Sequence, residues 1–153
     1  MNSMTSPPQT MTLGDWVLKV REPNGPGPYR VMLLLHGWTG DEDVMWVFAP
    51  RLPKDSVLIS LRGLYPTPEG GYGWHTHQES AWPLLEHFLP AVEALERLLI
   101  QLQAGQPGLL AAEYSRPSLL GFSQGAAMAY SYALLHPERV DRLAGLAGFM
   151  PEG

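Results

Sequence analysis

The stretch LLGFSQGAAMA, residues 119–129, places one serine between two glycines where an apolar run gives way to small residues. This composition predicts a strand that turns sharply into a helix, because Gly121 and Gly125 carry no β-carbons that would clash in a tight turn. A strained turn of this kind exposes its central side chain as a nucleophile. Ser123 is therefore a candidate catalytic residue, and the alternative is a structural serine that caps the helix.

The segments around this turn alternate between apolar runs and helical patterns. The runs predict an early strand followed by four buried ones, at residues 16–22, 29–37, 55–63, 116–122 and 142–150. Helices are expected after Asp41 or Asp43, over the apolar stripe from Ala81 to Leu102, and after Ser123. Pro90 must kink the second helix or mark its beginning.

Strands that alternate with helices predict an α/β fold, because parallel strands need crossover connections. We expect a mostly parallel sheet in a three-layer α/β/α arrangement, formed as one domain from residue 13 onward. Residues 1–12 are expected to be a flexible leader. The leader has neither a basic and apolar signal pattern nor a membrane-spanning run, which predicts a cytoplasmic protein with no membrane span.

The composition of the 153 residues excludes several kinds of binding partner and of site chemistry. The net charge is −5 and the basic residues are scattered, so no nucleic-acid partner is expected. Because the chain has no cysteine, disulfides, thiolate nucleophiles and cysteine-bound metals are excluded.

A second glycine-containing segment, LLLHGWTGDED at residues 33–43, follows a predicted buried strand. The backbone N–H of Trp38 can there point at the oxygen of a reacting carbonyl, and the N–H of Gln124 can supply a second donor at the helix N-terminus. The two amides would form an oxyanion hole, with His36 bracing the loop. The alternative is a glycine-rich turn without a catalytic role.

The loop at residues 64–80, LYPTPEGGYGWHTHQES, is too long for a plain connector and is a candidate wall of the site. Its residues Tyr72 and Trp74 are candidate substrate-binding residues, although aromatic side chains more often serve packing. Histidines 75, 77 and 87 lack an acidic third ligand at a recognisable spacing, so no metal site is expected.

These segments, in this order, resemble the phospholipase/carboxylesterase branch of the α/β-hydrolase fold, which includes the acyl-protein thioesterases. The resemblance extends over about residues 16 to 151. It implies a serine hydrolase that acts on a small-molecule carboxylic ester or thioester and needs no cofactor. By position, Ser123 matches the nucleophile, and Trp38 and Gln124 match the oxyanion-hole residues.

The chain departs from this family after the serine. Chains of this fold supply the triad in the order serine, acid, histidine, and the only candidates after Ser123 are His136, Glu138, Asp141 and Glu152. His136 is expected at the far end of the helix that Ser123 begins, roughly 20 Å away. We therefore expect residues 13–153 to form the N-terminal two thirds of a hydrolase domain, without its acid and histidine.

The last predicted strand is apolar on both faces, so it is a candidate for self-association through an exposed sheet edge. The alternative function is a non-catalytic, truncated or pseudo-hydrolase chain that acts as a binding or interaction protein.

Overall fold

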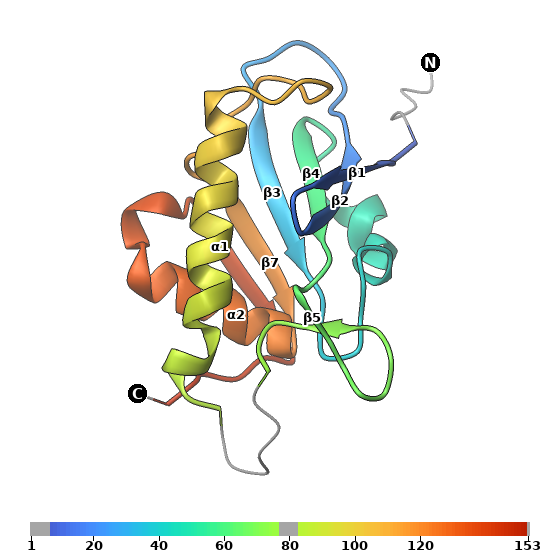
Figure 1. Ribbon diagram of the computed structural model, residues 1–153. Coiled ribbons are helices and arrows are strands. Elements are labelled where there is room, and N and C mark those ends of the chain that lie inside the picture. Colours follow the sequence, from blue (N-terminus) through green and yellow to red (C-terminus); the bar gives the residue numbers. More distant parts are fainter. Residues whose placement is uncertain (1–6, 77–82, 153) are drawn as a thin grey trace.

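The computed structural model describes residues 7–76 and 83–152, which build one mixed six-stranded sheet with helices against it (Figure 1). The strand order is β1-β2-β4-β3-β7-β8. β3, β4, β7 and β8 run parallel, whereas β1 and β2 pair antiparallel at one edge. The strand bounds are β1 Gln9–Leu13, β2 Trp16–Arg21, β3 Arg30–Leu35, β4 Ser56–Leu61, β7 Ser118–Phe122 and β8 Leu143–Leu146. The predicted α/β class with a mostly parallel sheet is confirmed.

Within the described ranges, two long helices, two 3-10 helices and a small hairpin complete the fold. The helices are η1 Val44–Arg51, α1 Leu85–Ala104, α2 Gln124–Leu135 and η2 Pro137–Arg139, and the hairpin pairs β5 Tyr65–Pro66 with β6 Tyr72–Gly73. Figure 1 shows α1 crossing in front of the parallel strands, beside α2.

The alternation of side chains along the strands divides the core between the two faces of the sheet. Leu33 and Leu35 of β3 belong to the large cluster that α1 and α2 cover. Leu34, on the opposite face, packs in a smaller cluster with Met45 of η1 and Leu120 of β7. Because both faces are covered, the central strands are mostly apolar, and β4 is buried at every position, its two serines included.

The predicted apolar stripe of α1 forms the main contact of this helix with the core. Phe88, Val92, Leu95 and Leu99 are buried there. The helix begins at Leu85, so Pro90 lies inside it rather than at its start, and Ala81 is outside the described residues.

The expected flexible leader is wrong for residues 9–12. These residues form most of β1, which pairs antiparallel with β2 from Gln9 opposite Val20 to Leu13 opposite Trp16. Thr10 and Thr12 alternate with Met11 and Leu13, which is a short period-2 strand pattern. The leader prediction for residues 1–6 concerns a segment outside the described residues.

The register of the parallel strands brings several loops to one edge of the sheet. Leu35, the last residue of β3, lies opposite Leu61 of β4 and Gly121 of β7. Phe122 of β7 lies opposite Leu146, the last residue of β8. The carboxyl ends of all four parallel strands therefore meet, and this is the edge at which open α/β sheets bind ligands.

The final strand differs from its sequence prediction in length and burial. β8 covers only Leu143–Leu146 of the predicted range, lies at the end of the strand order, and keeps Leu143 and Leu146 partly exposed. This arrangement leaves self-association through β8 as a prediction.

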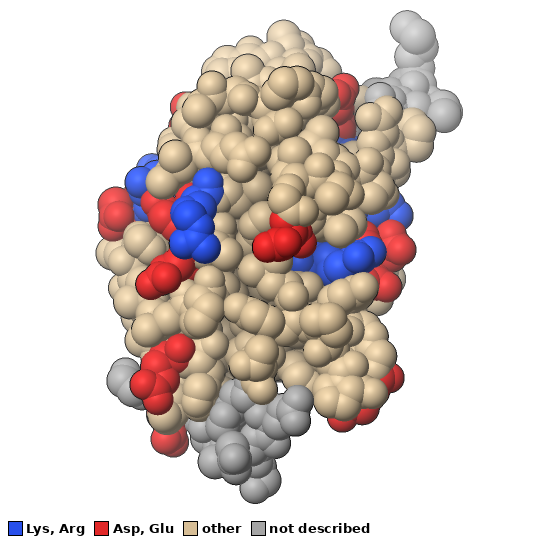
Figure 2. Space-filling model, in the orientation of Figure 1, with Lys and Arg blue, Asp and Glu red and all other residues tan. Residues whose placement is uncertain are grey.

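The molecular surface carries charges of both signs in small groups. On the face shown in Figure 2, lysine and arginine stand near aspartate and glutamate, and most of the surface is uncharged. Among the described residues, no helix combines the length and apolar character needed to cross a membrane. The cytoplasmic location stays a prediction.

Candidate active site

Ser123 lies between the end of β7 and the first turn of α2, in a backbone conformation that few non-glycine residues adopt. Its φ is +54° and its ψ is −115°. A conformation of this kind costs about 1–3 kcal/mol and persists only where the surroundings impose it. The Ser123 side chain makes no capping hydrogen bond to the helix. The geometry is that of the predicted sharp turn, with the serine half-buried, and not of a serine N-cap.

The two flanking glycines permit this turn because backbone approaches them closely. A β-carbon on Gly121 would lie 2.4 Å from the carbonyl oxygen of Gly125, and one on Gly125 would lie 2.0 Å from the carbonyl oxygen of Leu35. Neither position has room for a side chain. The backbone of Ser123 is also tied to the last strand, since its N–H donates to the carbonyl of Leu146 at 2.8 Å.

The loop that follows β3 packs directly against the serine. A β-carbon on Gly37 would lie 3.3 Å from Cβ of Ser123 and 3.2 Å from the carbonyl oxygen of Phe122. The structure thus brings together the segments of Trp38 and Ser123, which the sequence predicted to converge.

His36 holds this loop in place through its buried ring, as the sequence analysis expected. Its ring is buried, its Nε2 accepts the N–H of Gly63 at 2.8 Å, and its Nδ1 lies 2.6 Å from the carbonyl oxygen of Gly37. Nε2 must be unprotonated to accept, so Nδ1 carries the proton and donates it. Burial lowers the pKa of His36, because the charged imidazolium would lose its hydration. Both ring nitrogens are thereby committed to the backbone.

Gln124 has a side-chain role that the sequence analysis missed, since only its main chain was assigned a function. Its Oε1 accepts the backbone N–H of Trp74 at 2.7 Å, and its Nε2 lies 3.1 Å from Nε2 of His75. Because Oε1 is fixed by an N–H donor, Nε2 is the amide nitrogen and donates to the imidazole. The His75 ring in turn stacks on Trp38, with centroids 5.8 Å apart. The sequence analysis placed Gln124 at the start of a helix, and nothing in the local pattern indicated these side-chain contacts.

The two predicted substrate-binding aromatics occupy different environments. The Trp74 indole is fully buried, packs near Trp16, and donates from Nε1 to the carbonyl of His36 at 2.7 Å. Tyr72 is partly exposed, and the guanidinium of Arg62 lies over its ring at 4.6 Å. Trp74 therefore has a packing role in this structure, and substrate contact by either residue stays a prediction.

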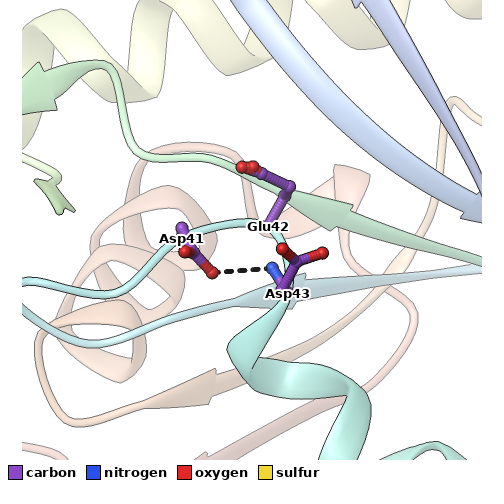
Figure 3. Close-up of side chains that lie close together, drawn as sticks. All are labelled: Asp41, Glu42 and Asp43. Atoms are coloured by element: carbon purple, nitrogen blue, oxygen red, sulfur yellow. Dashed lines mark hydrogen bonds between the residues drawn. The ribbon is translucent and has the colours of Figure 1, made fainter.

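Three consecutive carboxylates, Asp41, Glu42 and Asp43, follow the loop after β3 (Figure 3). One oxygen of each of Asp41, Glu42 and Asp43 lies within 4.8 Å of the others. Glu42 accepts a bidentate pair of hydrogen bonds from Arg62, at 2.7 Å for the shortest contact, and Asp43 pairs with Lys19 at 2.6 Å. Asp41 accepts the N–H of Asp43. These contacts give each of the three acidic residues a structural role in fixing the start of η1.

The rings of the described histidines contact groups other than Ser123. His36 is committed as above, Nδ1 of His87 accepts the N–H of Leu84 at 2.9 Å, and Nε2 of His75 faces Gln124. His136 lies beyond the C-terminal end of α2, and twelve helical residues separate it from the serine by about 18 Å. His77 is outside the described residues. Among residues 7–76 and 83–152, no recorded hydrogen bond joins an imidazole to the hydroxyl of Ser123.

Comparison with known families assigns the fold. The sequence profile described as "alpha/beta hydrolase fold" matches residues 30–152, which include the loop after β3, the turn at Ser123 and β8. In the solved structure of a carboxylesterase from Mesorhizobium loti, the matching region superposes with a TM-score of 0.76 at 23% identity. That match covers 96% of this chain and 68% of the carboxylesterase.

Two curated proteins are similar in sequence. One, from Bacillus subtilis (strain 168), is named "Putative 2-succinyl-6-hydroxy-2,4-cyclohexadiene-1-carboxylate synthase" and is 27% identical over 137 residues, covering 87% of this chain and 42% of its own length. The other, a "Serine hydrolase-like protein" of Danio rerio, is 26% identical over 129 residues and covers 83% of this chain and 34% of its own length. The chain thus spans less than half the length of these curated relatives.

Proposed function

Because this chain belongs to the alpha/beta hydrolase fold family, we propose that it carries the nucleophile and oxyanion hole of an ester hydrolase. Oγ of Ser123 attacks the carbonyl carbon of the ester while a base takes the hydroxyl proton. The alcohol then leaves, and water releases the acyl group from the serine. The observation that carries the proposal is the strained backbone of Ser123, held against the loop after β3.

The oxyanion hole in this proposal consists of the backbone N–H groups of Trp38 and Gln124. Gln124 is the first residue of α2, where an amide has no partner inside the helix and the helix dipole favours negative charge. Trp38 comes from the loop whose Gly37 touches the serine. Each such donor contributes about 3 kcal/mol to lowering the barrier.

The substrate class in this proposal is a small-molecule carboxylic ester or thioester. The serine hydrolase-like relative and the carboxylesterase among the solved structures support hydrolysis of this kind. The chemistry needs only the serine, a base and water, and no step requires a cofactor.

The general base is proposed to lie outside the described residues, because the described imidazoles have other partners. Without a base, the oxyanion hole and substrate binding retain an acceleration on the order of 10³ over water. We expect Ser123 to react slowly in residues 1–153, and a small imidazole in solution to speed the reaction by acting as the base.

The test is labelling with a fluorophosphonate probe, followed by mass spectrometry of the modified peptide. We expect slow labelling at Ser123, faster labelling when imidazole is added, and none in Ser123→Ala. Ser115→Ala is the matched control, since Ser115 lies in a loop before β7 and should not affect the rate. Labelling that is equal in Ser123→Ala would overturn the assignment of the nucleophile.

The second candidate function is a non-catalytic binding protein that keeps the hydrolase fold. The observation that favours it is the set of histidine contacts, none of which reaches the serine among the described residues. A folded chain whose Ser123 does not react with the probe, with or without imidazole, would establish this function in place of the first.

A further inference from the structure

The two proposed oxyanion donors, the N–H groups of Trp38 and Gln124, come from separate segments of the chain. Trp38 belongs to the loop after β3, and Gln124 is the first residue of α2. An oxyanion hole works only when both donors point at one oxygen, and a displacement of about 1 Å can cost about a hundredfold in rate. A residue that contacts both segments can therefore set the geometry of the hole without touching the substrate.

The backbone of residues 73–74 packs against both donor residues. A β-carbon on Gly73 would lie 2.4 Å from the ring of Trp38 and 3.1 Å from Oε1 of Gln124. The N–H of Trp74 donates to the same Oε1 at 2.7 Å. The chain that leads to His75 thus already joins the side chain of one donor residue to the side chain of the other.

The ring of His75 contacts the same two residues through different parts of the imidazole. Its Nε2 accepts the side-chain amide N–H of Gln124 at 3.1 Å. Its face stacks on Trp38, with the ring centroids 5.8 Å apart and the planes at 29°. Phe88 of α1 meets the ring edge to face, with centroids 5.0 Å apart at 85°, and both His75 and Phe88 are buried. The imidazole is therefore packed against α1 while it contacts both donor residues.

We propose that His75 is a positioning residue of the oxyanion hole, which holds the N–H groups of Trp38 and Gln124 toward one point. This inference rests on the proposed function. The ring nitrogen holds Gln124, and the ring face holds Trp38. A phenylalanine at position 75 would keep the stacking face and lose the acceptor, whereas a glutamine would keep an acceptor oxygen and lose the ring. The two contacts can therefore be removed one at a time.

NMR of the amide groups tests the two contacts separately and does not depend on reaction at the serine. In His75→Phe we expect the larger shift at the amides of Gln124, its side chain included, and in His75→Gln the larger shift at the amide of Trp38. The matched control is His136→Phe, beyond the C-terminal end of α2, where the ring contacts Tyr132. This variant should shift neither signal. Shifts of Trp38 and Gln124 that always appear together, or that are absent from both His75 variants, would overturn the inference.

Labelling of Ser123 with the fluorophosphonate probe, in the presence of imidazole, links these contacts to the hole, because the phosphonyl oxygen of the probe occupies the position of the oxyanion. We expect His75→Phe and His75→Gln each to slow labelling by about tenfold, since either substitution frees one donor to move. Each rate is divided by the folded fraction from urea denaturation. A loss of stability alone would therefore leave the corrected rate unchanged. His136→Phe should label at the native rate.

The outcomes separate this inference from the proposed function. Native labelling rates in both folded His75 variants would overturn the positioning role and leave Ser123 as the nucleophile. A native chain whose Ser123 does not react would refute the proposed function, and the NMR shifts would still decide whether His75 holds the two residues. If His75→Phe fails to fold, His75→Gln decides through the Trp38 shift and the labelling rate.

Discussion

The side-chain oxygen of Gln124 accepts the backbone N–H of Trp74 at 2.7 Å, which ties the loop after β4 to the residue next to the candidate nucleophile. Both residues are buried, so this bond satisfies a donor that has no access to water. The N–H of Gln124 is a proposed oxyanion donor. Its position at the head of α2 is thus braced through its own side chain.

Removing this acceptor should destabilise the fold measurably. Gln124→Ala leaves the Trp74 amide buried without a partner, which costs about 1–3 kcal/mol in the free energy of unfolding. Gln103→Ala is the matched control, because Gln103 accepts the N–H of Ser115 at an exposed position. Urea denaturation measures both variants. Equal losses in the two variants would contradict the structural role assigned to Gln124.

The backbone features of the site could be predicted from the sequence better than its side-chain contacts. The pattern around Ser123 predicted the turn, because only glycine fits where backbone approaches as closely as it does at Gly125. The contacts of Gln124 with Trp74 and His75 join residues about fifty positions apart, and no local pattern encodes them. The same applies to the burial of Trp74, which packs near Trp16 of β2 and near His36 of the loop after β3.

The fold shows a similar division. The alternating strands and helices predicted the parallel core, since apolar runs of this length are buried on both faces. β1 was missed because its partner strand, and not its own hydrophobicity, orders it: only Met11 and Leu13 of its five residues are partly buried. The exposure of β8 was also hidden, because it depends on the position of the strand in the sheet.

The glycine after the candidate nucleophile should not tolerate a methyl group. Gly125→Ala would place a β-carbon 2.0 Å from the carbonyl oxygen of Leu35, so the strand and helix must separate. We expect a loss of about 3 kcal/mol or more in the free energy of unfolding. Gly14→Ala is the control: its φ is +58°, but a β-carbon there meets nothing within 4 Å. That variant should lose only about 1–2 kcal/mol, measured by the same denaturation.

His36 should make the free energy of unfolding fall as the pH drops below the ordinary pKa of histidine. Burial lowers its pKa in the folded chain, whereas the unfolded chain titrates near about 6.5. Below that pH the unfolded state binds more protons, so the free energy of unfolding decreases by up to about 1.4 kcal/mol per pH unit. Unfolding by denaturant, followed by fluorescence at several pH values between 7 and 5, should show this slope.

Two measurements separate His36 from the other histidines. His36→Gln should flatten the pH slope, whereas His136→Gln, at the C-terminal end of α2, should leave the His36 contribution in place. NMR of the native ring should show the neutral form with the proton on Nδ1, as its contacts with Gly37 and Gly63 require. A charged His36 ring in the folded chain at pH 7 would refute the assignment.

The ion pair of Arg62 with Glu42 should contribute far more to the free energy of unfolding than the ion pair of Lys19 with Asp43. The Glu42 side chain is only 7% exposed and accepts bidentate bonds from Arg62, whereas the Asp43 side chain is 62% exposed. Arg62→Ala leaves the buried carboxylate of Glu42 without its partner and removes the contact over Tyr72. We therefore expect a loss of about 3 kcal/mol in the free energy of unfolding. Lys19→Ala breaks a surface pair and should cost no more than about 1 kcal/mol. Raising the salt concentration should weaken the Lys19–Asp43 pair more than the Arg62–Glu42 pair, because salt screens exposed charges. A loss for Lys19→Ala that matches the loss for Arg62→Ala would contradict the larger contribution assigned to the buried pair of Arg62 with Glu42.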